Sequence, residues 1–178
     1  MRNQQGFTLI ETLIAFIVLV FGLLGAVALQ AKAKQATYDS MQRAAALGVA
    51  NDIIERMETN TDGALAGNYN VNISSADAIS GGYVSCLNNN CSAAQLAAFD
   101  IEHWRKSIRA ADNTGSLADA RICIATNGDA EQININVVIS WESRQEIAGA
   151  DDANASKGNC GGTGERRRVL AMDSFLFI

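Results

Sequence analysis

The sequence predicts an α+β protein in which a long N-terminal α-helix, membrane-spanning in its first half and amphipathic in its second, packs on an antiparallel β-sheet head. Two observations predict this class. No residue from Thr12 to Ala31 is charged, and a helical repeat of apolar residues then continues to about residue 60. In the second half of the chain, three segments have the composition and alternation of strands. The 178 residues are 48% hydrophobic and 19% charged, which favours a folded chain over a disordered one.

The first part of the predicted helix is apolar without interruption over residues 13–29. A helix over residues 12–31 would be about 30 Å long, which matches the hydrocarbon thickness of a bilayer. A cleaved secretory signal is the alternative, but the uncharged run is longer than the usual apolar region of roughly 7–15 residues. The alanines at positions 26, 28 and 31 are compatible with a signal-peptide cleavage site. Basic residues lie on both sides of the run, Arg2 before it and Lys32 and Lys34 after it, so they do not favour one orientation of the helix across the membrane.

One acidic residue, Glu11, stands at the start of this apolar segment. A carboxylate at the edge of a spanning helix is costly, so it indicates a functional site. The alternative is that Glu11 lies at the membrane interface and reaches the lipid headgroups.

The residues around Glu11 carry a resemblance to a known family. The run Gly6-Phe-Thr-Leu-Ile-Glu11, with a short polar leader before it and an apolar helix after it, resembles the class III signal of type IV pilins and type II secretion pseudopilins. The continuation is most similar to PilV-type minor pilins and minor pseudopilins, through residues 11–15, 21–25 and 29–30. The resemblance implies the pilin fold.

The resemblance also implies how the N-terminus is processed and used. Residues 1–6 would be a prepilin leader, and a prepilin peptidase would cut between Gly6 and Phe7 and methylate the new amine of Phe7. In the family, the carboxylate of Glu11 would pair with the Phe7 amine of a neighbouring subunit. Residues 7–31 would form the transmembrane and assembly helix. Gly22 and Gly25 would let neighbouring helices approach closely, or are simply tolerated there.

The function implied by the resemblance is that of a minor pilin, a structural subunit and not an enzyme, which helps to initiate a type IV pilus near its tip. Its partners would be other minor pilins, the major pilin, prepilin peptidase and the inner-membrane assembly machinery. It would cross the inner membrane once with a periplasmic head, and later lie in the pilus at the cell surface. The alternatives are a minor pseudopilin of type II secretion and a membrane-anchored periplasmic binding module.

The second half of the long helix, residues 32–60, is predicted to be amphipathic. Apolar residues at spacings of three and four predict one packed face, and polar residues, Gln42, Asp52 and Arg56 among them, lie largely elsewhere. The predicted face consists of Tyr38, Met41, Ala45, Val49, Ile53 and Met57. The run Asn60-Thr-Asp-Gly63 predicts the end of the helix.

Residues 61–178 are predicted to form the globular α+β head. Ser92 and Gln95 have capping-box spacing and open a helix whose apolar face is Leu96, Ile101, Trp104 and Ile108. Residues 112–115 would end that helix. Strands are predicted at 69–73, 121–125, 132–141 and 168–178, and a Gly-rich loop at 149–164.

All four cysteines lie in this head, at positions 86, 91, 123 and 160. An even number in an exported protein predicts two disulfides, and three pairings are compatible with the sequence. We favour Cys86–Cys91 and Cys123–Cys160. A zinc site made of all four is the alternative, but the spacing of Cys86 and Cys91 is unusual for zinc.

The sequence offers no catalytic motif, and no catalytic residue, cofactor or metal is predicted. His103 is the single imidazole, which excludes a site that needs two, and we expect it to be a helix residue and not a base. No nucleophile elbow, Walker A loop or dinucleotide fingerprint is present. The net charge of −5 gives no electrostatic reason to expect a nucleic-acid partner.

Three further segments of the head have two interpretations each. Residues 151–154 have oxygen ligands for calcium but are expected to form a solvated acidic turn. The arginines at 166–168 are expected to be the solvated start of a strand and not a contact with an acidic neighbour. The tail at 175–178 is expected to be a core strand, with a partner-facing edge as the alternative.

Overall fold

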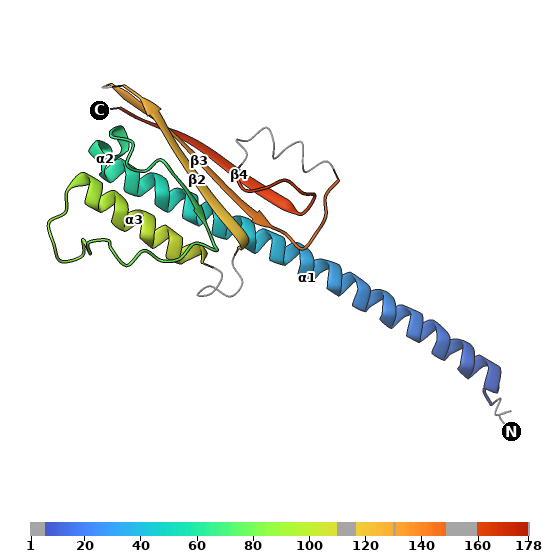
Figure 1. The fold of residues 1–178 in the computed structure, drawn as a ribbon. Coiled ribbons are helices and arrows are strands. Elements are labelled where there is room, and N and C mark those ends of the chain that lie inside the picture. The colour runs from blue at the N-terminus through green and yellow to red at the C-terminus, as the bar shows by residue number, and fades with distance from the viewer. Residues whose placement is uncertain (1–5, 110–116, 130, 149–159, 178) are drawn as a thin grey trace. The chain divides into compact units, whose positions relative to one another are not determined.

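The computed structural model describes residues 6–109, 117–129, 131–148 and 160–177. The chain forms two compact units, Met1–Tyr38 and Asp39–Ile178. The predicted α+β class is confirmed, because a long N-terminal helix is followed by a four-stranded antiparallel sheet and shorter helices (Figure 1).

The first helix, α1, runs without a break over Leu9–Thr59, close to the bounds predicted from the sequence. Thr8 precedes it, and the backbone N–H of Glu11 donates to the Thr8 carbonyl and, at 3.4 Å, to its hydroxyl. In the first unit every described residue up to Thr37 is exposed. Among the described helices, α1 is the one whose length and composition would allow it to cross a membrane.

In the second unit, one face of α1 is buried, and it differs from the predicted face by one residue over part of its length. Ile53 and Met57 are buried as predicted, but Met41 is 65% exposed. The buried positions nearer the first unit are Gln42, Ala46 and Ala50. Ala45 and Val49 of the predicted face are partly buried against the same core, so the packed face is displaced by one residue and not replaced.

The run that starts at Asn60 does more than end α1. It opens a second short helix, α2 (Thr61–Leu65), and the Asn60 side chain accepts a hydrogen bond from the N–H of Gly63. A Cβ on Gly63 would lie 2.5 Å from the Asn60 amide nitrogen, so this turn requires glycine.

The sheet contains β1 (Val71–Ser74), β2 (Ala118–Gly128), β3 (Gln132–Glu142) and β4 (Arg167–Phe177), in that order and antiparallel throughout. Each strand overlaps a predicted one, and β2 is longer than predicted. Tyr69 lies before β1 and not inside it. In the β2–β3 connection the Asp129 carboxylate accepts bonds from the N–H groups of Glu131 and Gln132, which lowers its pKa.

The helix α3 (Ala93–Ile108) begins with the predicted capping box. The N–H of Gln95 donates to the Ser92 hydroxyl, and the N–H of Ser92 donates to the Gln95 side chain. The buried face of α3 is Ala97, Asp100, Trp104 and Ile108, with Glu102 also buried beside it. Leu96 and Ile101 are half-buried. The helix ends before residues 112–115, which lie outside the described residues.

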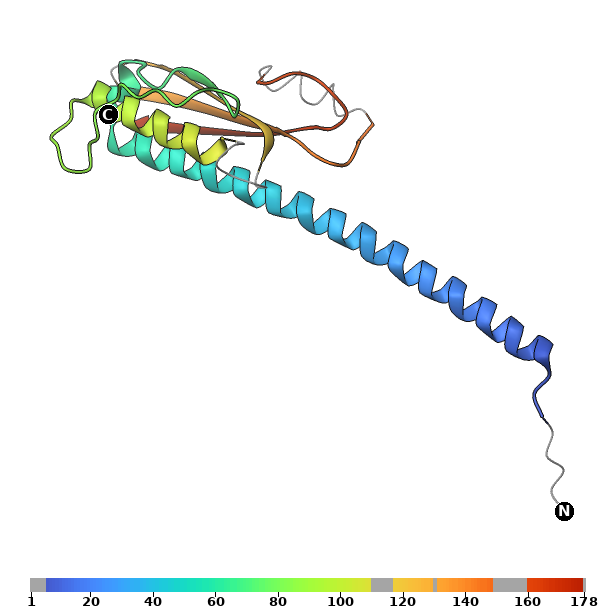
Figure 2. The ribbon, with the colours of Figure 1, turned by 60° about the horizontal axis from the view of Figure 1, so that its bottom comes forward.

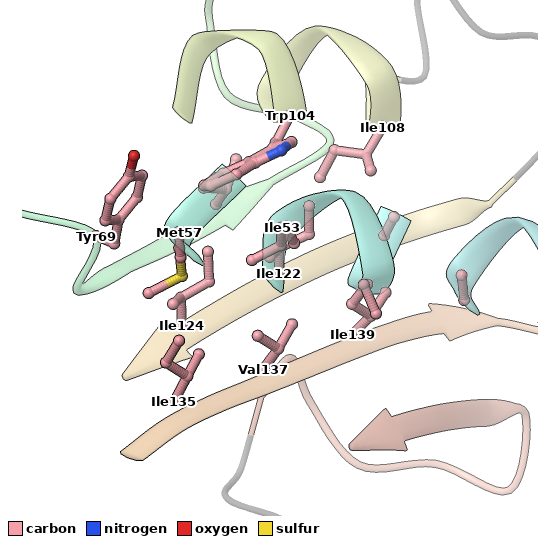
Figure 3. Packing of buried hydrophobic residues seen from close by; sticks show 14 of the residues in the cluster. Ile53, Met57, Tyr69, Trp104, Ile108, Ile122, Ile124, Ile135, Val137 and Ile139 are labelled. Atoms are coloured by element: carbon pink, nitrogen blue, oxygen red, sulfur yellow. The ribbon is translucent and has the colours of Figure 1, made fainter. Parts of the chain in front are cut away.

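The hydrophobic core lies between the sheet on one side and α1 and α3 on the other (Figure 2). Figure 3 shows Ile53, Met57, Trp104 and Ile108 from the helices facing side chains of β2 and β3. The buried side chains of β3 that face the helices are Ile133, Ile135, Val137, Ile139 and Trp141. Every residue of this core belongs to the second unit.

The structure pairs Cys86 with Cys91 and Cys123 with Cys160, the arrangement favoured from the sequence. All four cysteines are described and none is a free thiol, so the zinc alternative is wrong. Cys160 lies against the opposite face of the sheet, where its sulfur is 3.4 Å from the carbonyl oxygen of Val138. Of the predicted loop at 149–164, residues 149–159 lie outside the described part of the chain.

Two expectations about the last strand are wrong. Arg168 is buried and donates to the carbonyl oxygens of Glu165 and Gln145, and Arg167 pairs with Asp119, so this part of the arginine run is not solvated. Phe175 and Phe177 are 60% and 74% exposed, so the tail is not a core strand throughout. Because side chains alternate along a strand, Leu176 packs on the core while its neighbours point away.

Candidate assembly site

The bond predicted to be cut lies in an accessible segment. Gly6, Phe7 and Thr8 precede α1 and adopt no helical structure, and all three are exposed. A Cβ on Gly6 would meet nothing within 4 Å. A peptidase can therefore reach the backbone between Gly6 and Phe7 without unfolding any helix.

Glu11 lies in the first turn of α1. The sequence Thr8-Leu-Ile-Glu11 has capping-box spacing, and the Thr8 hydroxyl accepts the backbone N–H of Glu11. The positive end of the helix dipole favours a carboxylate at this position. Among the described residues none donates a hydrogen bond to the Glu11 side chain, which is exposed. The described residues therefore leave the Glu11 carboxylate accessible to a cation of another molecule.

Two glycines lie on the same side of α1 as Glu11. At about 100° per residue, Gly22 lies about 20° and Gly25 about 40° around the helix from Glu11. A Cβ on either glycine would meet nothing within 4 Å, so both positions are open. The arrangement leaves a shallow surface beside the carboxylate where a second helix can approach closely.

The rest of the first unit exposes a belt of large apolar side chains. Leu9, Phe16 and Leu29 are examples, each more than two-thirds exposed. A surface of this size and composition suits a helix that is covered by lipid or by other apolar helices.

The head holds a second constellation, a chain of hydrogen bonds that joins α1 to α3. The indole N–H of Trp104 donates to the Asp52 carboxylate at 2.8 Å. Arg56 bonds to both Asp52 and Asp100 at 3.0 Å. Burial lowers the pKa of Arg56, but its bonds to the two carboxylates outweigh this and the net shift is upward.

The same network continues through Tyr69 to the start of α2. The Tyr69 hydroxyl donates to Asp100 at 2.8 Å and accepts from the Asn60 amide at 2.9 Å. Burial, assisted by the neighbouring carboxylate, raises the pKa of Tyr69 well above its ordinary value, although the Asn60 bond opposes this. Tyr69 therefore stays protonated, and the network serves as a structural clamp between helices.

Sequence reasoning did not find this network. It placed Asp52 and Arg56 on the polar side of α1, whereas their side chains reach across to α3. A signal was present at Asp100, because it repeats with Ala97 and Trp104 at the spacing of one helix face. An acidic residue in such a face has to be paired when it is buried.

The described residues contain no arrangement that suggests catalysis. His103 is exposed on α3. No group of three or more described His, Cys, Asp or Glu residues is placed to hold a metal ion. A cleft of about 460 Å³ is lined by charged residues of both signs near Asp119 and Arg167, and these two residues pair with each other. The predicted turn at 151–154 lies outside the described residues.

Comparisons with known families agree with the N-terminal site. A family model described as the prokaryotic N-terminal methylation motif matches residues 1–27. A second one, described as type IV pilin Tt1218, matches residues 28–102, which cover the rest of α1, α2, β1 and most of α3. Searches of curated proteins and of solved structures found no match.

Proposed function

Because the chain is a type IV pilin-like protein, with a methylation motif and a pilin match that together span residues 1–102, we propose that it is a minor pilin that helps to initiate assembly of a type IV pilus near its tip. In this proposal prepilin peptidase removes residues 1–6 and methylates the amine of Phe7. Residues 7–31 hold the subunit in the inner membrane, and the head lies in the periplasm until the subunit enters the fibre.

The observation that carries the proposal is the lone carboxylate of Glu11 at the start of an exposed apolar helix. Cleavage before Phe7 creates a cation four residues ahead of this carboxylate. Opposite charges attract strongly in a low-dielectric helix bundle, and a charge left unpaired there is penalised. Helices that would otherwise slide along their apolar surfaces are thus held where Glu11 of one subunit meets the Phe7 amine of the next.

Other features of the chain support the proposed helix contact, partners and compartment. Gly22 and Gly25 lie beside Glu11 on the helix and leave room for a second backbone. The proposed partners through this surface are the major pilin and other minor pilins, and prepilin peptidase acts on the exposed Gly6–Phe7 bond. The two disulfides of the head suit an oxidising compartment such as the periplasm.

The same N-terminal chemistry fits a minor pseudopilin of type II secretion, which is the second candidate. Deletion of the gene distinguishes the two candidates. Loss of pili and of twitching motility supports a minor pilin, whereas loss of secretion with normal pili supports a pseudopilin.

The direct test is Glu11→Gln in the full chain, with Glu58→Gln, an exposed position on the same helix, as the matched control. Mass spectrometry should find N-methylated Phe7 at the start of both variants. The amount of Glu11→Gln in sheared pili should fall at least about tenfold, which corresponds to about 1.4 kcal/mol, while Glu58→Gln assembles normally.

Two results would contradict the proposal at different points. Normal assembly of Glu11→Gln would remove the charge-pairing argument. A mature chain that still begins at Met1, or that begins beyond Leu29, would remove the pilin mechanism altogether.

A further inference from the structure

The two edges of the sheet differ in length and in how they end. The edge strand β1 has four residues, and the N–H of Ser74 at its end already donates to the Asp77 carboxylate at 2.8 Å. The opposite edge strand, β4, has 11 residues (Figure 1). In the order of the sheet, β4 has β3 on one side and no strand on the other. Within the described part of the chain, β4 is therefore the long open edge of the sheet.

The hydrogen-bond pattern identifies the open backbone groups of β4. The N–H of Ser143 donates to the carbonyl of Arg166, one step beyond the Glu142–Arg167 pair of the ladder. In an antiparallel pair the residues alternate between those bonded to the neighbouring strand and those that point away. Even-numbered residues of β4 therefore bond to β3. The N–H and C=O groups of Val169, Ala171, Asp173 and Phe175 point to the open edge, where no described residue bonds to them.

The hydrophobic layer beneath this edge is incomplete. Leu170, Met172 and Leu176 face the core but remain half-buried. A groove of about 230 Å³ lies beside them, between Arg43 and Leu47 of α1 and a wall of Trp141 and residues 169–171. Leu47 is 43% exposed, and the indole N–H of Trp141 is buried without a hydrogen-bond partner among the described residues.

Natural edge strands usually carry features that prevent pairing, and most of these are missing from β4. The chain has no proline, and β4 contains no lysine. Asp173 is the single charged residue between Val169 and Phe177. On the face that points away from the core, Phe175 and Phe177 are exposed and pack edge to face with ring centres 5.5 Å apart.

We propose that the open edge of β4 binds an extended segment of the head of another pilin-like subunit, which joins the sheet antiparallel to β4. Main-chain bonds would supply the affinity, and alternate side chains would supply the specificity. One set of side chains would enter the groove beside Leu47, and the other would cover Phe175 and Phe177. This inference rests on the proposed function, because it takes the partner to be another subunit of the same assembly.

The partner segment is not β4 of a second copy. Two antiparallel β4 strands would be related by a two-fold axis, so the α1 helices of the two heads would run in opposite directions. Subunits anchored in one membrane through the same N-terminal helix all point the same way. The proposed segment therefore belongs to a different strand or loop. Because it joins the sheet antiparallel to β4, it runs in the direction from Phe177 towards Arg167.

Photo-crosslinking in the full chain tests this arrangement. Benzoylphenylalanine replaces Val169, Ala171, Asp173 or Phe175, one at a time, in cells that assemble the fibre. All four positions should crosslink to one segment of one other pilin-like subunit. Each step of two residues towards the C-terminus of β4 should move the crosslinked partner residue two positions towards the N-terminus of that segment. Crosslinks from Leu87, which is exposed elsewhere on the head, serve as the control and should not map to that segment.

Other crosslinking outcomes overturn the proposal. The edge is not used as proposed if the crosslinked residues are scattered, or if their order shows the two segments to be parallel. The same holds if the crosslinks map to β4 of a second copy, or if assembled fibres give no crosslink. If the wild-type chain enters no fibre or pseudopilus, the proposed function fails first and the inference fails with it.

A pair of substitutions at one residue supplies a second readout. Ala171→Pro removes an N–H that points to the open edge and leaves the bonds to β3 intact, whereas Ala171→Ser keeps that N–H. Urea unfolding should confirm that both variants fold. Ala171→Pro should then enter fibres at least about fivefold less than Ala171→Ser, which corresponds to about 1 kcal/mol. Equal assembly of the two variants would contradict the proposal.

Discussion

Replacement of Asp100 by Ala is expected to lower the free energy of unfolding of the head by about 3 kcal/mol. Asp100 is buried, and its two carboxylate oxygens accept from Arg56 and from the Tyr69 hydroxyl. Without the carboxylate, the buried hydroxyl of Tyr69 loses its acceptor, which costs about 1–3 kcal/mol.

The loss on the side of Arg56 should be smaller than for a fully buried ion pair. The Arg56 side chain is 32% exposed and keeps its bond to Asp52. Water and Asp52 therefore replace part of the interaction of Arg56 with Asp100. Loss of this interaction should cost about 1 kcal/mol, instead of the 3–5 kcal/mol that breaking a fully buried ion pair costs. The sum of the two effects gives the expected value.

Urea unfolding of residues 39–178 measures this difference, because the whole hydrophobic core lies within that unit. With a slope of about 2 kcal/mol per molar urea, the midpoint should fall by about 1.5 M. Glu55→Ala, an exposed change on α1, is the control and should alter the stability by less than about 0.5 kcal/mol.

A small effect would refute the reasoning. If Asp100→Ala loses less than about 1 kcal/mol, the network does not clamp the helices. A double-mutant cycle with Tyr69→Phe separates the shared bond, and we expect a coupling energy of about 1 kcal/mol between the two residues.

Two more predictions concern the same head. Because the pKa of Tyr69 is higher in the folded chain than its ordinary value of 10.0, the stability it contributes is present below that pH and declines by about 1.4 kcal/mol per pH unit above it. Tyr69→Phe should reduce this alkaline decline in urea titrations, and an unchanged slope would contradict the assignment. Replacing both Cys123 and Cys160 by Ala should lower the stability by about 4 kcal/mol, against about 2 kcal/mol for Cys86 and Cys91, because the first bridge closes the longer loop. Equal losses from the two pairs would contradict this loop-entropy argument.

Local signals in the sequence predicted most of the elements. The capping box at Ser92 forms as expected, and each predicted strand is found, because alternation and turn residues act over short distances. The long helix was equally clear, since neither Pro nor a turn signal interrupts it before Asn60.

Side-chain environments were harder to predict. Met41 suits a packed helix face, yet the buried face passes through Gln42 because the sheet approaches from that side. Phe175 and Phe177 suit a core, yet β4 places Leu176 inward and leaves both rings outside. Periodicity states which residues share a face, but it does not state which face meets the rest of the protein.

The sequence by itself determined how the chemical groups of the N-terminus follow one another. The Gly6–Phe7 bond, the carboxylate of Glu11 and the uncharged helix are adjacent in the chain, so their relation needs no tertiary fold. Only the tertiary structure decided how Asp100 is paired and that β4 is the open edge of the sheet. The physical reason is that burial and strand order depend on contacts between residues distant in the chain, such as Arg56 and Asp100 at a separation of 44 residues and Tyr69 and Asp100 at 31, which no local pattern records.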